Sequence, residues 1–144
     1  MGSELTVGDI MTKNVITVEM GKTVEEAAKM MQKHKIGSVI VVEEKHGKKA
    51  KGIITERDIV HKLIAKRKDP YKVTVEEVMT TPLRVVKPET LLEEAARAMR
   101  ENRIKRLPVV NQKNEIVGII SEGDVMRIFP AVIEMLEEKV AIGL

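Results

Sequence analysis

The sequence contains no cysteine and no tryptophan, and only one tyrosine and one phenylalanine among its 144 residues. Without cysteine, disulfides, zinc–thiolate sites and thiol nucleophiles are excluded. With only three histidines, a histidine-rich metal site is not expected either. Because aromatic side chains are so few, we expect an aliphatic core and no stacking surface for single-stranded nucleic acid.

Long apolar segments are also missing. No apolar run approaches the roughly 18–20 residues that a membrane-spanning helix needs, and neither end resembles a secretory signal. We therefore expect a cytoplasmic protein without membrane contact. Hydrophobic residues make up 43% of the chain and charged residues 33%, which indicates a folded domain. The net charge of +3 suits a phosphate-bearing ligand but is too small to indicate nucleic acid.

The chain repeats itself. Shifted by 68 residues, positions 7–42 fall on positions 75–110, and 12 of these 36 positions are identical. Shifted by 66 residues, positions 52–60 fall on positions 118–126, and five of these nine are identical. Unrelated segments of this total length would share about three identities. The chain is therefore predicted to contain two copies of one structural unit.

These matches divide the chain into four parts. The first repeat is expected at residues 7–66 and the second at 75–129, joined by a linker at 67–74. One copy of about 60 residues buries too little surface to be comfortably stable alone, so we expect two copies packed about a pseudo-twofold axis. Residues 130–144 are predicted to form an amphipathic C-terminal helix. That helix either folds back on its own chain or packs against a second copy, and we favour the second copy.

Each repeat has the same predicted order of elements. A turn-like segment ending in Met-Thr and a short strand come first, followed by a one-sided helix. Thr-x-x-Glu capping boxes are expected to open these helices, at Thr23 with Glu26 and at Thr90 with Glu93. Two further strands and a second helix complete each repeat.

The second strands and helices of the repeats define the fold class. The runs Val39–Val42 and Ile116–Ile120 do not alternate with polar residues, which predicts strands covered on both faces. The second helices are expected over Glu56–Ala65 and Glu122–Ile128. The predicted class is α/β, with each repeat a small sheet covered by two helices. The lysine-rich loop at 45–51 is interpreted as a solvated hairpin tip rather than a nucleic-acid contact.

The most informative segments lie where a strand passes into the second helix of each repeat. Residues 52–58 and 118–124 both read glycine, two isoleucines, a hydroxyl residue, two spacers and an aspartate. One interpretation is structural: the hydroxyl residue caps the helix, and the aspartate three residues later bonds back to the cap. The other is functional. Free amides at a helix start favour an anion, and the aspartate can accept hydrogen bonds from both hydroxyls of a ribose.

In their order, spacing and duplication these fragments resemble the cystathionine-β-synthase-type (CBS) domain, and the tandem resembles a CBS pair, or Bateman module. The matching fragments are Met11-Thr12, Thr23-Val24-Glu25-Glu26-Ala27 and Thr55/Asp58, then Met79-Thr80, Glu93-Glu94-Ala95, Leu107-Pro108-Val109-Val110 and Ser121/Asp124. The resemblance implies a non-catalytic module that binds an adenosyl ligand in two clefts between the repeats. AMP, ADP or ATP is the expected ligand, with S-adenosylmethionine or NAD as alternatives. It also implies a homodimer.

The same resemblance implies which residues form the two sites. The first site is expected to use Thr55, Arg57 and Asp58, with Ile104, Lys105 and Arg106 from the second repeat. The second is expected to use Ser121, Gly123 and Asp124, with Ile16, Ile36 and Gly37 from the first repeat. In both, the aspartate holds the ribose, while backbone groups and aliphatic side chains hold the base.

Charge predicts that the two sites are unequal. Arg57, Lys105 and Arg106 are available to neutralise phosphates at the Asp58 site, whereas the corresponding positions of the other site are uncharged. A nucleotide is therefore expected to prefer the Asp58 site. One departure from the family pattern concerns Arg84, which stands where the first repeat has an aliphatic residue. It either obstructs the base or reaches a phosphate.

Three functions remain for the sequence. The first is a ligand-sensing regulatory module that acts through dimer contacts or a separate effector protein. The second is a structural homodimerisation module with vestigial clefts. The third, an enzyme acting on nucleotides, is least favoured, because no histidine is positioned in sequence as a base for Thr55 or Ser121.

Overall fold

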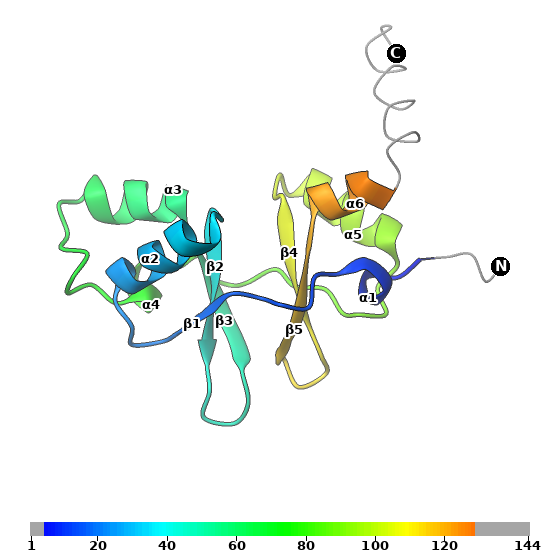
Figure 1. Ribbon diagram of the computed structural model, residues 1–144, viewed down its shortest axis with the longest axis horizontal. Helices are drawn as coiled ribbons and strands as arrows, with labels where there is room; N and C mark the ends of the chain where they lie inside the picture. The colour runs from blue at the N-terminus through cyan, green and yellow to red at the C-terminus, as the bar shows by residue number, and fades with distance from the viewer. Residues whose placement is uncertain (1–4, 129–144) are drawn as a thin grey trace, which may run out of the picture.

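The structure, a computed structural model, describes residues 5–128. Its two halves lie side by side, with the strands at the centre, their hairpin tips at the bottom and the helices towards the outer sides (Figure 1). This is the mixed α/β arrangement that the sequence predicts. The predicted C-terminal helix at 130–144 lies outside the described residues.

The strands form one sheet in each half. They are β1 (Thr17–Glu19), β2 (Ser38–Glu43), β3 (Lys49–Thr55), β4 (Arg106–Val110) and β5 (Ile116–Ser121). In the first half β1 pairs in parallel with β2, and β2 pairs antiparallel with β3. In the second half β4 pairs antiparallel with β5. The segment equivalent to β1 is represented there by a parallel bridge between Val86 and Val109.

The helices are short. They are α1 (Val7–Ile10), α2 (Val24–His34), α3 (Glu56–Asp58), α4 (Val75–Val78), α5 (Leu92–Glu101) and α6 (Glu122–Ile128), with a π-helical stretch, η1 (Ile59–Ile64), after α3. The sequence predicts a single helix where α3 and η1 follow one another, so the change to wider π-helical turns was not anticipated.

One of the two predicted capping boxes is present. In α2, Glu26 N–H donates to Thr23 Oγ1 at 3.3 Å, and Thr23 N–H donates to Glu26 Oε2 at 3.1 Å. The box predicted at Thr90 and Glu93 is wrong, because α5 begins one residue later with Leu91 as its cap. Thr90 Oγ1 instead accepts the Lys87 N–H at 3.1 Å and closes the turn that precedes the helix.

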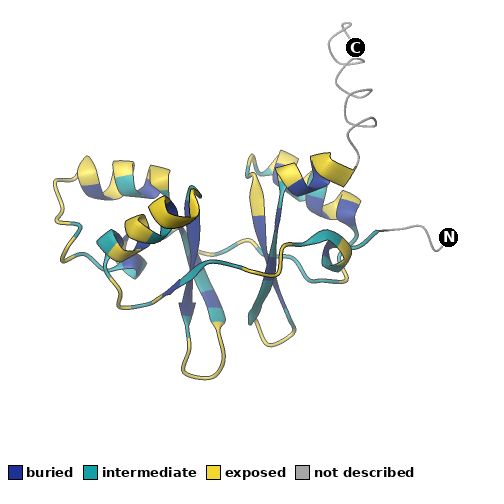
Figure 2. Ribbon diagram, viewed as in Figure 1, coloured by how far each residue is buried: buried dark blue, intermediate teal, exposed yellow. Residues whose placement is uncertain are grey.

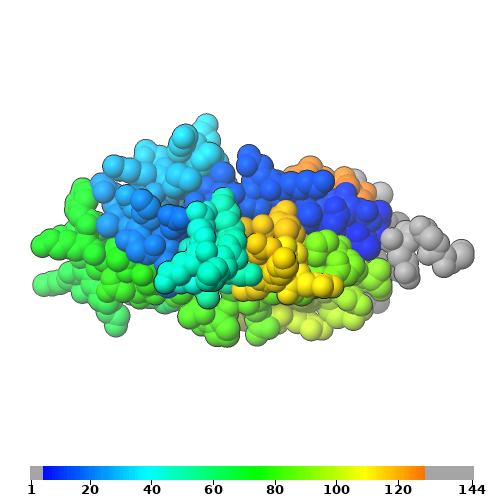
Figure 3. Space-filling model, turned by 90° about the horizontal axis from the view of Figure 1, so that it is seen from below, coloured from blue at the N-terminus to red at the C-terminus, as the bar shows by residue number. Residues whose placement is uncertain are grey.

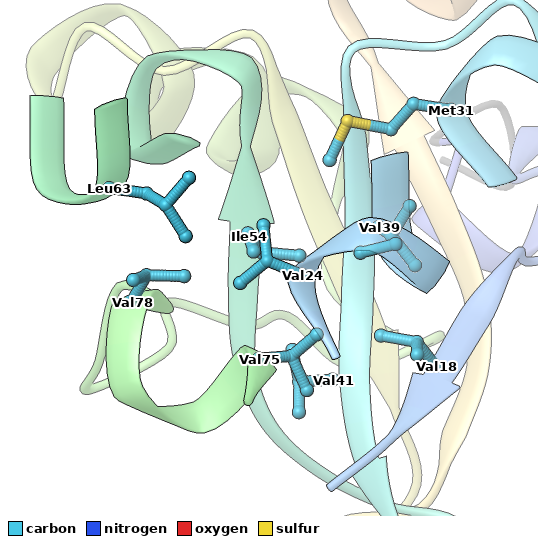
Figure 4. Close-up of a cluster of buried hydrophobic side chains, with 10 residues drawn as sticks. Val18, Val24, Met31, Val39, Val41, Ile54, Leu63, Val75 and Val78 are labelled. Atoms are coloured by element: carbon cyan, nitrogen blue, oxygen red, sulfur yellow. The ribbon is translucent and has the colours of Figure 1, made fainter. Parts of the chain in front are cut away.

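The two halves exchange their opening helices. α4 belongs to the second repeat by sequence, but Val75 and Val78 are fully buried in the core of the first half, facing Ile54 and Leu63 (Figure 4). Val7 of α1 is buried in the core of the second half in the same way. Figure 1 shows α4 beside the first sheet and α1 beside the second. Each core is therefore completed by the other repeat.

Main-chain pairing holds the exchanged segments in place. Thr80, just after α4, exchanges hydrogen bonds of 2.7 and 3.2 Å with Ile53 of β3. Thr12, just after α1, exchanges two of 2.9 Å with Ile119 of β5. Each of the duplicated Met-Thr dipeptides thus lies where the chain of one repeat pairs with a strand of the other, Thr80 with β3 and Thr12 with β5.

The two sheets also pack against each other. Val39 and Val41 of β2 contact the helical core of the first half, while Ile40 and Val42 join a separate cluster with Val110 of the second half. These four β2 residues are buried, which confirms the prediction of a strand covered on both faces (Figure 2). The same prediction for Ile116–Ile120 holds only in part, because Gly118 and Ile120 are buried while Ile116, Val117 and Ile119 are half-buried.

The hairpin tips of the two halves lie together (Figure 3). Ile116 N–H donates to Lys48 O and Ala50 N–H donates to Asn114 O, each at 3.0 Å. Residues 44–48 at the tip of the first hairpin are exposed, which confirms part of the solvated tip predicted at 45–51. Residues 49–51 instead belong to β3, and Ala50 is buried.

Candidate functional site

The aspartate of the first motif closes a capping box. Thr55 N–H and Thr55 Oγ1 both donate to Asp58 Oδ2 at 3.0 Å, and Asp58 N–H donates back to Thr55 Oγ1 at 3.1 Å. The motif lies at the β3–α3 junction, and Asp58 is buried. The structural interpretation of the motif is therefore correct, but it accounts for only one of the two carboxylate oxygens.

The second motif repeats this geometry at the β5–α6 junction. Ser121 N–H donates to Asp124 Oδ2 at 2.8 Å, and Asp124 N–H donates to Ser121 Oγ at 3.1 Å. Asp124 is as buried as Asp58. In both motifs the cap uses Oδ2, so Oδ1 decides what else each aspartate binds.

Oδ1 of Asp58 is bound from two directions. Thr80 Oγ1, from the second repeat, donates to it at 2.9 Å. Lys62 Nζ, one turn further along η1, forms an ion pair with it at 3.0 Å. The same ammonium donates to the carbonyl of Val78 at 3.2 Å. Lys62 therefore joins the aspartate of one repeat to the opening helix of the other.

Oδ1 of Asp124 has a different partner. Arg127 Nη2, at the end of α6, donates to it and forms an ion pair. The Arg127 side chain is 71% exposed, whereas the Lys62 side chain is 45% exposed. Within residues 5–128, Arg127 makes no other side-chain hydrogen bond, so its exposed side chain is held only by the buried Asp124 carboxylate.

A pocket of about 180 Å³ opens beside Asp124 where the halves meet. Its walls come from the segment before β1, from strands of both sheets and from the second motif. The lining residues are Thr12, Asn14, Val15, Ile16, Ile36, Ser38, Ile40, Arg106, Ile119, Ser121 and Asp124. The pocket is thus a property of the two halves together and of neither alone.

The chemistry of this pocket is divided. Ile16, Ile36 and Ile119 provide apolar walls, which suit the faces of a flat heterocycle. Ser121 and Asp124 provide a polar end that can bind hydroxyl groups. Arg106 adds a guanidinium that can bind an anionic group. A nucleoside with an anionic extension would match all three parts.

The structure brings together most of the residues expected at the second site. Ile16, Ile36, Ser121 and Asp124 all line the pocket. Gly37 does not: its carbonyl accepts the Glu56 N–H at 3.0 Å at the start of α3, and it lines a separate surface depression. Gly123 is exposed on α6 and is not part of the lining.

The residues expected at the first site are more scattered. Thr55 and Asp58 lie together, and Arg57 is exposed beside them on α3. Ile104 packs against the core of the second half. The carbonyl of Lys105 accepts the Glu122 N–H at 2.9 Å, which places this residue at the start of α6 rather than of α3.

Two arginines change the expected balance of charge. Arg106, expected at the Asp58 site, lines the Asp124 pocket, and Arg127 is paired with Asp124 itself. The Asp124 site therefore contains cationic side chains, contrary to the expectation from charge. The repeat alignment compared only the positions equivalent to Arg57, Lys105 and Arg106, so it did not reveal that Arg106 itself and Arg127 lie at the Asp124 site. Arg84 is exposed.

Five polar side chains at these sites were missed by sequence reasoning: Lys62, Thr80, Thr12, Asn14 and Arg127. The duplicated Met-Thr dipeptide was a usable signal for the two threonines, since it recurs once in each repeat, 68 residues apart. Lys62 and Arg127 follow their aspartates by four and three residues. This spacing is common for ion pairs on any exposed helix, so it did not single out these two residues.

Residues 5–128 contain no cluster of three or more histidine and acidic side chains placed to hold a metal ion. Over the same residues, no helix has the length and apolar character needed to cross a bilayer.

Duplicated strand–helix motifs that carry aspartates at the junction of two halves define a tandem ligand-binding module. The family model of the CBS domain matches residues 7–65 and 75–131. The chain therefore belongs to the CBS domain family and contains a tandem CBS pair, which confirms the resemblance seen in the sequence.

Individual proteins support this assignment. The CBS domain-containing protein YhcV of Bacillus subtilis is 40% identical over 119 residues, which are 83% of this chain and 81% of that protein. The CBS domain pair of protein MJ0100, solved in complex with 5′-methylthioadenosine and S-adenosyl-L-methionine, is 34% identical with a TM-score of 0.77, covering 88% of this chain and 97% of that one. A hexameric CBS-CP12 protein from bloom-forming cyanobacteria is 40% identical with a TM-score of 0.69, covering 85% and 69%.

Proposed function

We propose that this protein is a non-catalytic, cytoplasmic regulatory module that binds an adenosyl ligand and passes the signal to a partner through its own surface. The observation that carries the proposal is the pocket beside Asp124, where apolar walls from both halves meet a polar end, suited to hydroxyl groups, from the second half. A similar CBS pair, that of MJ0100, was solved with two adenosyl compounds, which supports the same ligand class here.

The size of the pocket limits what it encloses. A volume of about 180 Å³ is below the roughly 300–1,000 Å³ of common ligand pockets. We expect the base and ribose to be enclosed and any phosphate, methionine or second nucleotide to extend outwards past Arg106. AMP, ADP, ATP, S-adenosylmethionine and NAD all share the enclosed part, so the group at the 5′ position decides among them.

Calorimetric titration of the full chain with each of these five compounds tests the proposal. We expect saturable binding of at least one, lost in Asp124→Ala and retained in Asp69→Ala, an exposed aspartate outside both motifs. Binding at a ligand concentration 100 times the dissociation constant should raise the free energy of unfolding by about 2.7 kcal/mol. Absence of binding by all five compounds would refute the proposal, and nucleotide turnover would refute its non-catalytic part.

Passing the ligand signal to a partner requires a surface that another chain can contact. Val60 and Ile64 of η1 are 51% and 62% exposed, and Met126 and Ile128 of α6 are 44% and 43% exposed. These four residues belong to the second helices of the two repeats and form what we call the apolar helix ends. Exposed apolar side chains on corresponding helices favour self-association as a homodimer. A ligand can alter such an interface only through its different affinity for two conformations.

A second candidate function rests on the same surface. If the apolar helix ends associate and no adenosyl compound binds, the protein is a structural homodimerisation module with vestigial clefts. Sedimentation of the full chain with and without ligand separates the two functions, because only the regulatory module should change its association on binding.

A further inference from the structure

The two aspartates differ in how many of their acceptor positions are already occupied. A carboxylate offers about four such positions. Asp58 has four donors, namely Thr55 N–H, Thr55 Oγ1, Thr80 Oγ1 and Lys62 Nζ. Asp124 has two donors within the described chain, Ser121 N–H and Arg127 Nη2. Asp124 can therefore accept further hydrogen bonds, whereas Asp58 cannot do so without losing a partner.

The partners of Asp58 also differ in how easily they leave. Thr55 belongs to the helix cap and stays with it. Lys62 and Thr80 approach from outside the cap and share Oδ1. Lys62 is held in place by the Val78 carbonyl at 3.2 Å and the Met79 carbonyl at 3.5 Å. Because these carbonyls belong to the other repeat, moving Lys62 loosens a contact between the halves.

We propose that Lys62 is a built-in competitor for the ribose at the Asp58 site, so that a nucleoside binds first beside Asp124 and reaches Asp58 only by displacing this ammonium. The inference rests on the proposed function, since it concerns the same ligand class. It reverses the preference expected from charge alone. The expectation from charge counted Arg57, Lys105 and Arg106 as cations that attract phosphate, whereas in the folded chain a different cation, Lys62, occupies the Asp58 carboxylate.

Displacement connects ligand binding to the arrangement of the halves. A ribose that takes Asp58 Oδ1 releases Lys62 from Asp58, and with it the bonds to the Val78 and Met79 carbonyls. At the other site, Arg127 is largely exposed and leaves Asp124 without disturbing a second contact of the described chain. Occupancy at Asp58 is thus expected to shift α4 relative to η1, while occupancy at Asp124 is not.

Two methionines report on the sites separately. Met79 directly precedes Thr80, and Met11 directly precedes Thr12 in the lining of the Asp124 pocket. Methyl NMR of the full chain labelled at methionine, with these signals assigned by Met→Leu substitution, follows each site in one titration. Adenosine is the probe, because a neutral nucleoside removes phosphate attraction from the comparison, and 2′,3′-dideoxyadenosine lacks the hydroxyls.

In the unsubstituted chain, the Met11 signal should respond to adenosine at a lower concentration than the Met79 signal. Lys62→Met should lower the Met79 midpoint about tenfold, the value of one hydrogen bond to a charged group, and leave the Met11 midpoint unchanged. With 2′,3′-dideoxyadenosine, Lys62→Met should no longer lower the Met79 midpoint. Lys33→Met, a substitution of an exposed lysine on α2, should change neither midpoint.

Thr80→Ala serves as a second variant and should shift the Met79 midpoint in the same direction. An unchanged or higher Met79 midpoint in both variants would overturn the proposal while the Met11 response still supported ligand binding. A Met79 signal that responds first in the unsubstituted chain would also overturn it. If neither signal responds in any variant, the proposed function fails together with this inference.

Discussion

Met79 lies so close to Gly52 that a Cβ added to the glycine would be 2.6 Å from Met79 Sδ. The carbonyl of Thr80 would lie 3.0 Å from the same Cβ. The relationship recurs between Gly118 and Met11, where the distance is 2.5 Å. Each motif glycine therefore permits the exchanged segment of the other repeat to approach its strand. The ligand is not needed to explain these glycines.

Gly52→Ala should lower the free energy of unfolding by about 1–3 kcal/mol, because the added methyl group meets both a side chain and a fixed main-chain carbonyl. Urea unfolding monitored by circular dichroism measures the change. Gly123→Ala is the matched control: its Cβ would meet nothing nearer than 3.7 Å, and alanine favours the helix. Equal effects of the two substitutions would contradict the close approach.

The exchange of opening helices makes a second prediction. Val78→Ala should lower the free energy of unfolding by about 2 kcal/mol, because it removes two buried methyl groups. Val78 belongs to the second repeat by sequence, but these methyl groups lie in the core of the first half. Hydrogen exchange should accelerate in β2 and β3 of the first half. Tyr71→Ala, at a side chain 67% exposed, should change stability by less than about 0.5 kcal/mol. Acceleration confined to residues 75–128 would argue against the exchange.

Self-association through the apolar helix ends is tested by adding charge there. Val60→Asp with Ile64→Asp should dissociate the proposed homodimer, because two desolvated carboxylates would face an apolar partner. Sedimentation velocity reports the mass, and circular dichroism checks that the fold survives. Tyr71→Asp, at another exposed side chain that belongs to neither η1 nor α6, should leave association intact. A dimer that persists in the double variant would place the interface elsewhere.

The cap of α4 predicts a specific pH dependence. Thr74 N–H and Thr74 Oγ1 donate to Glu77 Oε2 at 2.8 and 2.9 Å and hold the pKa of Glu77 below its usual value of 4.5. A lowered pKa in the folded chain contributes stability that is complete above the unfolded pKa and is lost as the pH falls through the folded one. Glu77→Gln should therefore be less stable near neutral pH, and the difference should narrow below pH 4.5.

Urea unfolding at neutral pH and at about pH 3 measures this narrowing. Glu89→Gln, at an exposed glutamate before α5, should show no such convergence. A difference between Glu77→Gln and the unsubstituted chain that stays constant with pH would show that the Glu77 carboxylate does not stabilise the fold.

Local sequence patterns predicted helices and strands well where interactions within a few residues determine them. The spacing of Val24, Ala27, Ala28 and Met31 predicted the buried face of α2. Val24, Ala27 and Met31 are buried, whereas Ala28 is exposed at the edge of that face. The prediction failed at Thr90 because the same hydroxyl suits a turn and a helix cap equally, and only the surrounding chain selects between them. At the candidate site, the spacing of hydroxyl and aspartate revealed both caps but not the partners of the second oxygen.

From its sequence alone, the chain was determined to be a duplicated α/β unit of the CBS family with an aspartate motif in each copy. Repetition and short-range spacing carry that information, because they act within a few residues. Only the tertiary structure decided that the halves exchange α1 and α4, that Arg106 borders the Asp124 pocket, and that Lys62 occupies Asp58. Those outcomes depend on contacts between distant segments, whose geometry is set by the packing of both halves together.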